Sequence, residues 1–124
     1  MCIKVFIFLL TLLFGCSKPQ KEISHNLTSS EKQGLEIFLR MSCNACHSID
    51  GSLRLGPTIK NQYGTKIRHT DGSIFVINDI YIRESIIDPL KYIVEGYTPI
   101  MPSYKPILKE EEIQNLIAYI KSLR

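Results

Sequence analysis

The residues with the most distinctive chemistry lie in one pentapeptide, Cys43-Asn44-Ala45-Cys46-His47. Two thiols three positions apart on one helical turn can reach both vinyl groups of one haem and form thioethers with them. The adjacent imidazole of His47 is a usual proximal ligand of haem iron. C-x-x-C-H is the sequence pattern of covalent haem attachment. We therefore predict one covalent haem c, attached at Cys43 and Cys46, with His47 as an axial ligand of its iron.

Three other uses of this cysteine pair explain the pattern less well. A thioredoxin-like redox pair needs a βαβ setting, which the flanking sequence does not predict. A zinc site needs a second pair of ligands at metal spacing. The chain has four cysteines, but Cys2 lies within the predicted signal 1–15 that is removed and Cys16 is the candidate lipid site, so no second pair remains. A simple disulfide leaves the adjacent His47 without a role.

A second axial ligand is expected to be a methionine, because a thioether is the usual soft partner of histidine in electron carriers. Met41 lies two residues before Cys43 and cannot reach the opposite face of the haem. Met101 lies in a loop between Pro99 and Pro102, which restrict the backbone. We therefore predict Met101 as the second ligand; the alternative is that its side chain fills a gap in the core.

Residues 1–15 have the features of an export signal. A lysine precedes an apolar run over 5–14, and a small residue follows it. The run is half as long as the ~20 residues that a membrane-spanning helix needs. The four residues that end at Cys16 resemble a bacterial lipobox, although Phe14 stands where a small residue is usual. We predict a lipoprotein signal peptide over 1–15 and lipidation of Cys16; the alternative is a cysteine that only follows a signal cleaved elsewhere.

The segment 16–27 is polar and charged, and we expect it to be a flexible tether in which His25 is exposed. Residues 28–124 then form a single domain. The 124-residue chain has 15 Lys and Arg against 12 Asp and Glu, a net charge of +3, which is too little for a nucleic-acid binder. Without residues 1–15 the domain is of a size that often needs a cofactor to complete its core.

The first predicted helix begins at the capping box formed by Thr28 and Glu31. Its periodicity indicates one apolar face, which comprises Leu35, Phe38 and Leu39. A glycine within this helix lowers its stability by about 1 kcal/mol relative to alanine. We therefore expect that Gly34 permits a close approach of another segment.

Two further helices are expected. One is capped by Asn78 or Asp79, runs through Ile87 and ends at Asp88-Pro89. The last begins at the acidic residues 110–112, which we interpret as favourable to the helix dipole rather than as a metal or docking site. Its apolar stripe is Ile113, Leu116, Ile117 and Ile120.

A small β-hairpin is predicted between these helices, near 66–77. Two short apolar runs flank the segment 70–73, whose Asp71-Gly72 pair is a strong hairpin signal. We expect His69 to be an exposed strand residue, and it remains only an alternative iron ligand. The predicted fold class is all-α, with three to four helices around one covalent haem and this hairpin as an insertion.

From Gly34 to Leu123 the chain resembles the class I c-type cytochromes. The matching pieces are Gly34…Phe38, the pentapeptide 43–47, Leu55-Gly56-Pro57, Met101-Pro102 and Ala118-Tyr119-Ile120. Within that family it looks most like the cytochrome c domain fused to subunit II of some bacterial haem–copper oxidases. The segments that carry this finer resemblance are 81–89, 93–97 and 101–104.

The resemblance implies roles for individual residues. Cys43 and Cys46 would carry the thioethers, and His47 and Met101 would be the axial ligands. Pro57 would offer its carbonyl to the far ring nitrogen of His47, which fixes the tautomer and makes the imidazole a stronger donor. The glycine and phenylalanine of the first helix would pack across the last helix.

The implied function is transfer of single electrons in a respiratory chain, with a terminal haem–copper oxidase as acceptor and no catalytic residue. We expect a monomer on the periplasmic side of a bacterial membrane, held there by its lipid, with redox proteins as partners. The sequence contains no cupredoxin-like domain, so we expect a separate, tethered form. The alternatives are an obligate subunit of a larger redox enzyme and a peroxidase or gas sensor in which Met101 is displaced.

Overall fold

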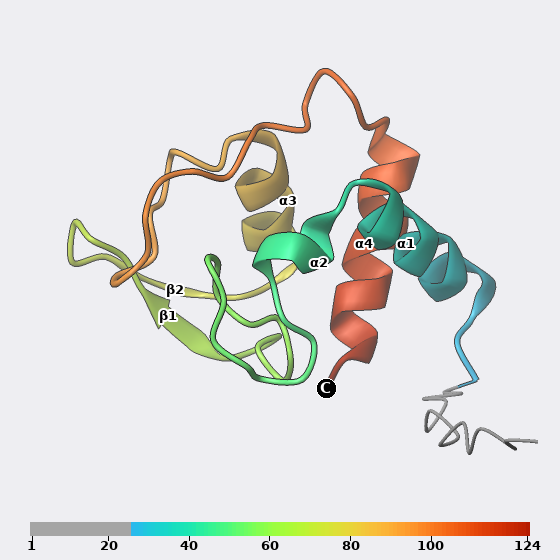
Figure 1. Ribbon diagram of the computed structural model, residues 1–124, viewed down its shortest axis with the longest axis horizontal. Helices are drawn as coiled ribbons and strands as arrows, with labels where there is room; N and C mark the ends of the chain where they lie inside the picture. The colour runs from blue at the N-terminus through green and yellow to red at the C-terminus, as the bar shows by residue number, and fades with distance from the viewer. Residues whose placement is uncertain (1–25) are drawn as a thin grey trace, which may run out of the picture.

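The computed structural model describes residues 26–124, which contain four helices and one two-stranded sheet (Figure 1). The order of elements is α1 (Ser29–Arg40), α2 (Cys43–Cys46), β1 (Lys66–Arg68), β2 (Ile74–Val76), α3 (Asp79–Ile87) and α4 (Glu110–Ser122). The fold is therefore mainly helical with a small sheet. The predicted signal peptide, Cys16 and His25 lie outside the described residues.

Helices α1 and α4 cross side by side (Figure 1). Their closest approach is at Gly34 of α1. A Cβ atom on this glycine would lie 2.0 Å from the carbonyl oxygen of Asn115. Glycine therefore permits the close approach predicted from the sequence. Next to the crossing, the rings of Phe38 and Tyr119 pack with their centroids 5.4 Å apart.

The buried face of α1 differs from the predicted one. Gly34, Ile37 and Phe38 are buried, whereas Leu39 is 53% exposed and that part of the prediction is wrong. The observed face follows the i, i+3, i+4 spacing from the glycine, and the predicted face is rotated from it by one residue, or about 100°. The error arose because a glycine at the closest point of the crossing does not contribute to an apolar pattern.

Helix α4 carries much of the core. Its buried residues are Ile113, Leu116, Ile117 and Tyr119, while Ile120 is half-buried. The acidic first turn does more than complement the helix dipole. Glu112 accepts from the backbone N–H of Lys109 at 3.0 Å and also pairs with Arg40 of α1.

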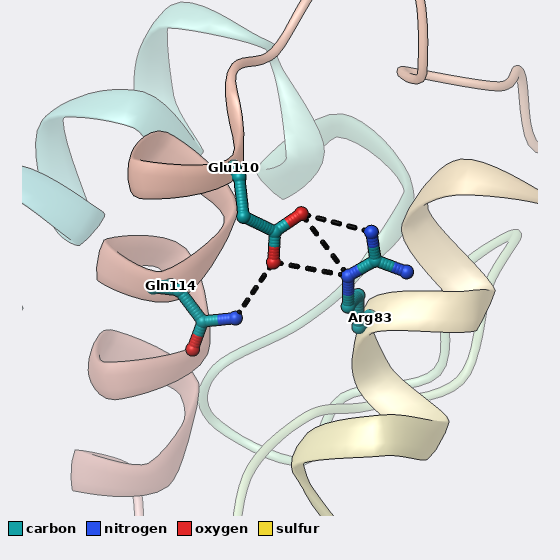
Figure 2. A network of polar contacts seen from close by, with 3 residues as sticks. All are labelled: Arg83, Glu110 and Gln114. Carbon is teal, nitrogen blue, oxygen red and sulfur yellow. Dashed lines mark hydrogen bonds and ion pairs between the residues drawn. The ribbon is translucent and has the colours of Figure 1, made fainter.

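A second carboxylate of this turn joins α4 to α3. Figure 2 shows that Arg83 donates to both oxygens of Glu110, at 2.8–3.1 Å, while Gln114 donates to one of them at 2.9 Å. These hydrogen bonds, that from Arg83 first, lower the pKa of Glu110 to about 2. Because all three side chains are at the surface, this network orients the helices rather than supplying much of the stability.

Helix α3 begins and ends as predicted. The side chain of Asn78 accepts from the N–H of Tyr81 at 2.9 Å, and the helix ends before Asp88-Pro89. Ile82 and Ile86 form its buried face. Among residues 26–124, no helix combines the length and apolar character needed to cross a membrane.

The hairpin also forms as predicted. Strands β1 and β2 pair antiparallel with Ile67 opposite Phe75, and Gly72 in the turn has a φ of +84°. The prediction that His69 is exposed is wrong, because this residue is only 1% exposed. It forms a bridge with Val94, a residue of the segment that precedes α4, and this distant segment covers it.

Candidate haem site

The short helix α2 presents two thiols on one turn. The N–H of His47 donates to the carbonyl of Cys43 at 2.9 Å, and the N–H of Gly56 donates to the carbonyl of Cys46 at 2.9 Å. Both cysteines are free thiols, so the structure does not contain the disulfide that was an alternative reading. Burial raises the pKa of the Cys43 thiol. Because neither cysteine forms a disulfide, both sulfur atoms are available for reaction with one cofactor.

The imidazole of His47 is held in one orientation from two sides. Its Nδ1 lies 2.7 Å from the carbonyl oxygen of Pro57, an acceptor that requires the proton on Nδ1 and leaves Nε2 with a free lone pair. A Cβ atom on Gly56 would lie 2.6 Å from Cε1 of the ring. The ring therefore rests against a backbone that only glycine provides. Sequence reasoning did not single out Gly56, although it lies between the matching Leu55 and Pro57.

The loop that contains Met101 is held by the two residues that follow Pro102. Ser103 Oγ donates to the carbonyl of Ile87 at 2.6 Å, at the end of α3. The Tyr104 N–H donates to the carbonyl of Ile86 at 3.0 Å, and its hydroxyl donates to the carbonyl of Met41 at 3.3 Å. These bonds position the methionine loop against both α3 and the segment before α2. Sequence reasoning assigned the stiffness to prolines and missed these anchors.

All the residues predicted for the described part of the site line one cavity. Cys43, Cys46, His47, Pro57 and Met101 are on its wall. Neither Met41 nor His69, the two alternative ligands considered, is part of the lining. Among residues 26–124 the lining includes no Asp, Glu, Lys or Arg. Its apolar part includes Phe38, Ile59, Ile67, Ile77, Ile82, Ile86, Ile93, Val94, Leu116 and Ile120, with Tyr81, Tyr92, Tyr97 and Tyr104.

This donor set fits a covalently attached haem. Two free thiols can form thioethers, one imidazole nitrogen is unpaired, and a thioether sulfur belongs to the same wall. The uncharged lining suits the apolar body of a porphyrin. When bound, haem supplies an iron atom that changes its charge by one on gaining or losing an electron.

The comparisons with known proteins agree with this geometry. A model of the family described as "Cytochrome c" matches residues 31–124. The chain is also 32% identical over 111 residues to the protein named "Cytochrome c oxidase subunit 2" of Alkalihalophilus pseudofirmus. That match covers 89% of this chain but only 30% of the relative. The chain therefore corresponds to less than a third of the relative's length. The chain belongs to the cytochrome c family, which makes it an electron-transfer protein with covalently bound haem rather than a catalytic enzyme.

Proposed function

We propose that this protein is a monohaem electron carrier in which Cys43 and Cys46 hold the haem and His47 and Met101 are its axial ligands. The observation that carries the proposal is that these four residues line a single uncharged cavity. The contact of His47 with Pro57 supports it further, because it directs Nε2 away from the backbone and makes it a stronger donor. A thioether as the other ligand raises the reduction potential.

A site with two protein ligands on the iron suits electron transfer without substrate binding. Nothing small can bind the iron unless Met101 leaves first, and the loop that carries it is anchored at Ser103 and Tyr104. This anchoring favours a carrier over a peroxidase or gas sensor. A protein that only transfers electrons needs no acid or base positioned at the iron, and the cavity wall has no carboxylate or lysine among residues 26–124.

The mature protein is proposed to be exported and tethered. Residues 1–15 would be removed as a lipoprotein signal, Cys16 would be lipidated, and the segment 16–27 would connect the anchor to the domain 28–124. The sequence pattern supports this proposal. Two acyl chains give stable membrane attachment, whereas one is marginal. The domain would then work as a monomer on the periplasmic side of a bacterial membrane, within reach of its tether.

The proposed electron acceptor is a terminal haem–copper oxidase of a respiratory chain. The support is the match to a protein named as an oxidase subunit 2, over 30% of that protein's length. The same match favours a second candidate, in which this chain is a fixed subunit of a larger redox complex. The two candidates differ in stoichiometry: a carrier is separable from its acceptor, and a subunit copurifies with fixed partners.

Mass spectrometry of the native membrane protein tests attachment and anchoring together. We expect the mass of residues 16–124 with one haem and with acyl chains on Cys16. A mass without haem contradicts the proposed function, and a chain that begins elsewhere contradicts the anchor alone. Purification in mild detergent distinguishes the candidates, since a constant ratio to oxidase subunits identifies a fixed subunit.

The axial ligand is tested by Met101→Ala in the haem-loaded protein. We expect haem to stay attached, the reduction potential to fall and external ligands such as imidazole to bind, because one axial position opens. Visible spectra and a redox titration measure these changes. Ile107→Ala, a change in an exposed residue outside the cavity wall, is the control. An unchanged spectrum and potential in the Met101 variant would mean that another residue is the ligand.

A further inference from the structure

The buried histidine His69 has no role in the proposed haem site, yet it is one of the most buried side chains in the described part of the protein, at 1% exposure. It lies between the rings of three aromatic residues, with centroids 5.3 Å from Phe75, 5.6 Å from Tyr81 and 5.5 Å from Tyr92. An imidazole ordinarily changes its charge between about pH 5 and 8. The hydrogen bonds of this ring decide which other groups a charge on it would affect.

Both nitrogens of this imidazole belong to a row of hydrogen bonds. Nε2 lies 2.9 Å from the hydroxyl of Tyr81, and Nδ1 lies 3.3 Å from Oγ of Ser73. Ser73 Oγ in turn donates to the carboxylate of Asp71 at 2.6 Å. Asp71 is exposed in the hairpin turn, whereas Tyr81 is part of the cavity wall. The row therefore connects solvent to the cavity.

The direction of the hydrogen bonds follows from the donor at Ser73. Because its one hydroxyl proton points to Asp71, the Ser73 oxygen accepts from Nδ1–H of His69. In the neutral imidazole Nε2 then accepts from the hydroxyl of Tyr81. A proton added to Nε2 reverses that last bond, since Tyr81 must now accept and its own proton must turn away from His69. Protonation thus changes a dipole on the wall of the haem cavity.

We propose that His69 takes up a proton from solvent when the protein is reduced and releases it on oxidation. This inference rests on the proposed haem function. On reduction, one electron arrives from the donor protein and one proton from water binds Nε2. On oxidation, the electron passes to the acceptor and the proton returns to water. The physical reason is charge: an added electron makes the uncharged cavity more negative, and an imidazolium separated from it by little water gains stability.

The other charged and titratable groups around His69 do not cancel this effect. Asp71 is on the solvent side and favours the imidazolium. Burial raises the pKa of the Tyr81 hydroxyl above its ordinary value, so Tyr81 carries no charge at physiological pH. Tyr92 faces His69 with its aromatic ring. The neighbouring Arg68 has Glu95 at 3.9 Å as a partner of opposite charge, and Lys91 lies outside on the ring of Tyr92 at 4.9 Å.

The test compares the pH dependence of the midpoint potential in the haem-loaded wild type and in His69→Gln. Linkage requires that a tenfold difference in proton affinity between the redox states changes the potential by about 59 mV across the titration. We expect the wild-type potential to fall as pH rises through the range where the imidazole titrates, and the Gln variant to be flat there. A Gln variant with the wild-type pH dependence overturns the proposal.

A second measurement does not depend on electron transfer rates or on the variant folding. NMR titration of the His69 ring in the oxidised and reduced wild type should give midpoints about one pH unit apart, the reduced form being the higher. Equal midpoints, or a ring that does not titrate in either state, overturn the proposal.

Tyr81→Phe separates coupling from packing, because it removes the hydroxyl and keeps the ring. We expect it to reduce the pH dependence by at least half. Tyr119→Phe is the matched control, since Tyr119 is a buried tyrosine outside the cavity wall and the hydroxyl that contacts His69 belongs to Tyr81; it should leave the pH dependence unchanged. Equal effects of the two changes contradict the coupling. A failure of haem attachment in the wild type would refute the proposed function instead, before any of these titrations is made.

Discussion

The α1–α4 crossing and the haem cavity are two parts of one core that are built differently. At the crossing, backbone lies against backbone at Gly34, the rings of Phe38 and Tyr119 meet, and Ser30 donates to Asn115 at 2.5 Å. These contacts are all between groups of the chain itself. Around the cavity, by contrast, isoleucine and tyrosine side chains from five separate segments face a shared space. The first part is completed by packing and the second by a cofactor.

This difference implies unequal dependence on haem. The helix pair uses local capping and close packing, so it can persist when attachment fails. The hairpin, α3 and the methionine loop meet mainly around the cavity, so they depend on what fills it. We expect the first part to be sensitive to any added atom, and the second to be sensitive to the loss of a ligand or thioether.

The largest effect is expected from Cys43→Ser combined with Cys46→Ser. Haem should no longer be covalently attached. The hairpin and α3 should then lose their protection from hydrogen exchange before α1 and α4 do, because they line the cavity that haem fills. Haem that stays with the protein after denaturing extraction measures attachment. Asn44→Ser, in the exposed residue between the cysteines, is the control. A double variant with wild-type protection throughout would show that the two parts do not differ.

The next largest effect should come from Gly34→Ala. The added Cβ meets the Asn115 carbonyl at 2.0 Å and Tyr119 Cβ at 2.7 Å, so the helices must separate. We expect a loss of about 3 kcal/mol in the free energy of unfolding, measured in denaturant, with haem still attached. The control is Lys32→Ala on the exposed face of α1, which should change stability by less than about 0.5 kcal/mol. A tolerated Gly34→Ala would refute the interpretation of this crossing as backbone packing.

A smaller effect is expected from Gly56→Ala on the cavity side. The new Cβ would lie 2.6 Å from Cε1 of His47, but a side chain can shift where a backbone carbonyl cannot. We expect a loss of about 1–2 kcal/mol in stability together with a changed reduction potential, because the bond from Nδ1 to Pro57 is disturbed. Redox titration and denaturation measure the two. Leu53→Ala, at a residue that is 94% exposed, should change neither.

The smallest effect concerns acid stability and the surface network of Figure 2. The pKa of Glu110 is lowered from 4.5 to about 2 by Arg83 and Gln114, so its contribution is complete above about pH 4.5 and is lost as pH falls towards 2. Glu110→Gln should therefore reduce stability at neutral pH slightly and flatten its decline in that acidic window. Glu111→Gln, on the exposed neighbour, is the control. Parallel pH profiles for wild type and Glu110→Gln would contradict the link.

Local patterns in the sequence were enough for most elements. Four local signals each depend on residues only a few positions apart. They are the capping box at Thr28, the helix N-cap at Asn78, the helix end before Pro89 and the hairpin turn at Gly72. The errors fell where distant segments meet. Leu39 faces solvent because the crossing at Gly34 sets the rotation of α1, and His69 is buried because the segment around Val94 covers it.

The sequence by itself determined the kind of site, because thioether attachment and axial ligation require two thiols and an imidazole at a local spacing that can be read directly. It also predicted Met101 as the second ligand, by elimination among few candidates, and Met101 lines the cavity. Only the tertiary structure decided what surrounds them: Gly56 against the imidazole, Tyr104 anchoring the methionine loop, and the row from Asp71 through His69 to Tyr81. The physical reason is that burial and hydrogen bonding between remote segments depend on how the chain folds back, which no local spacing encodes.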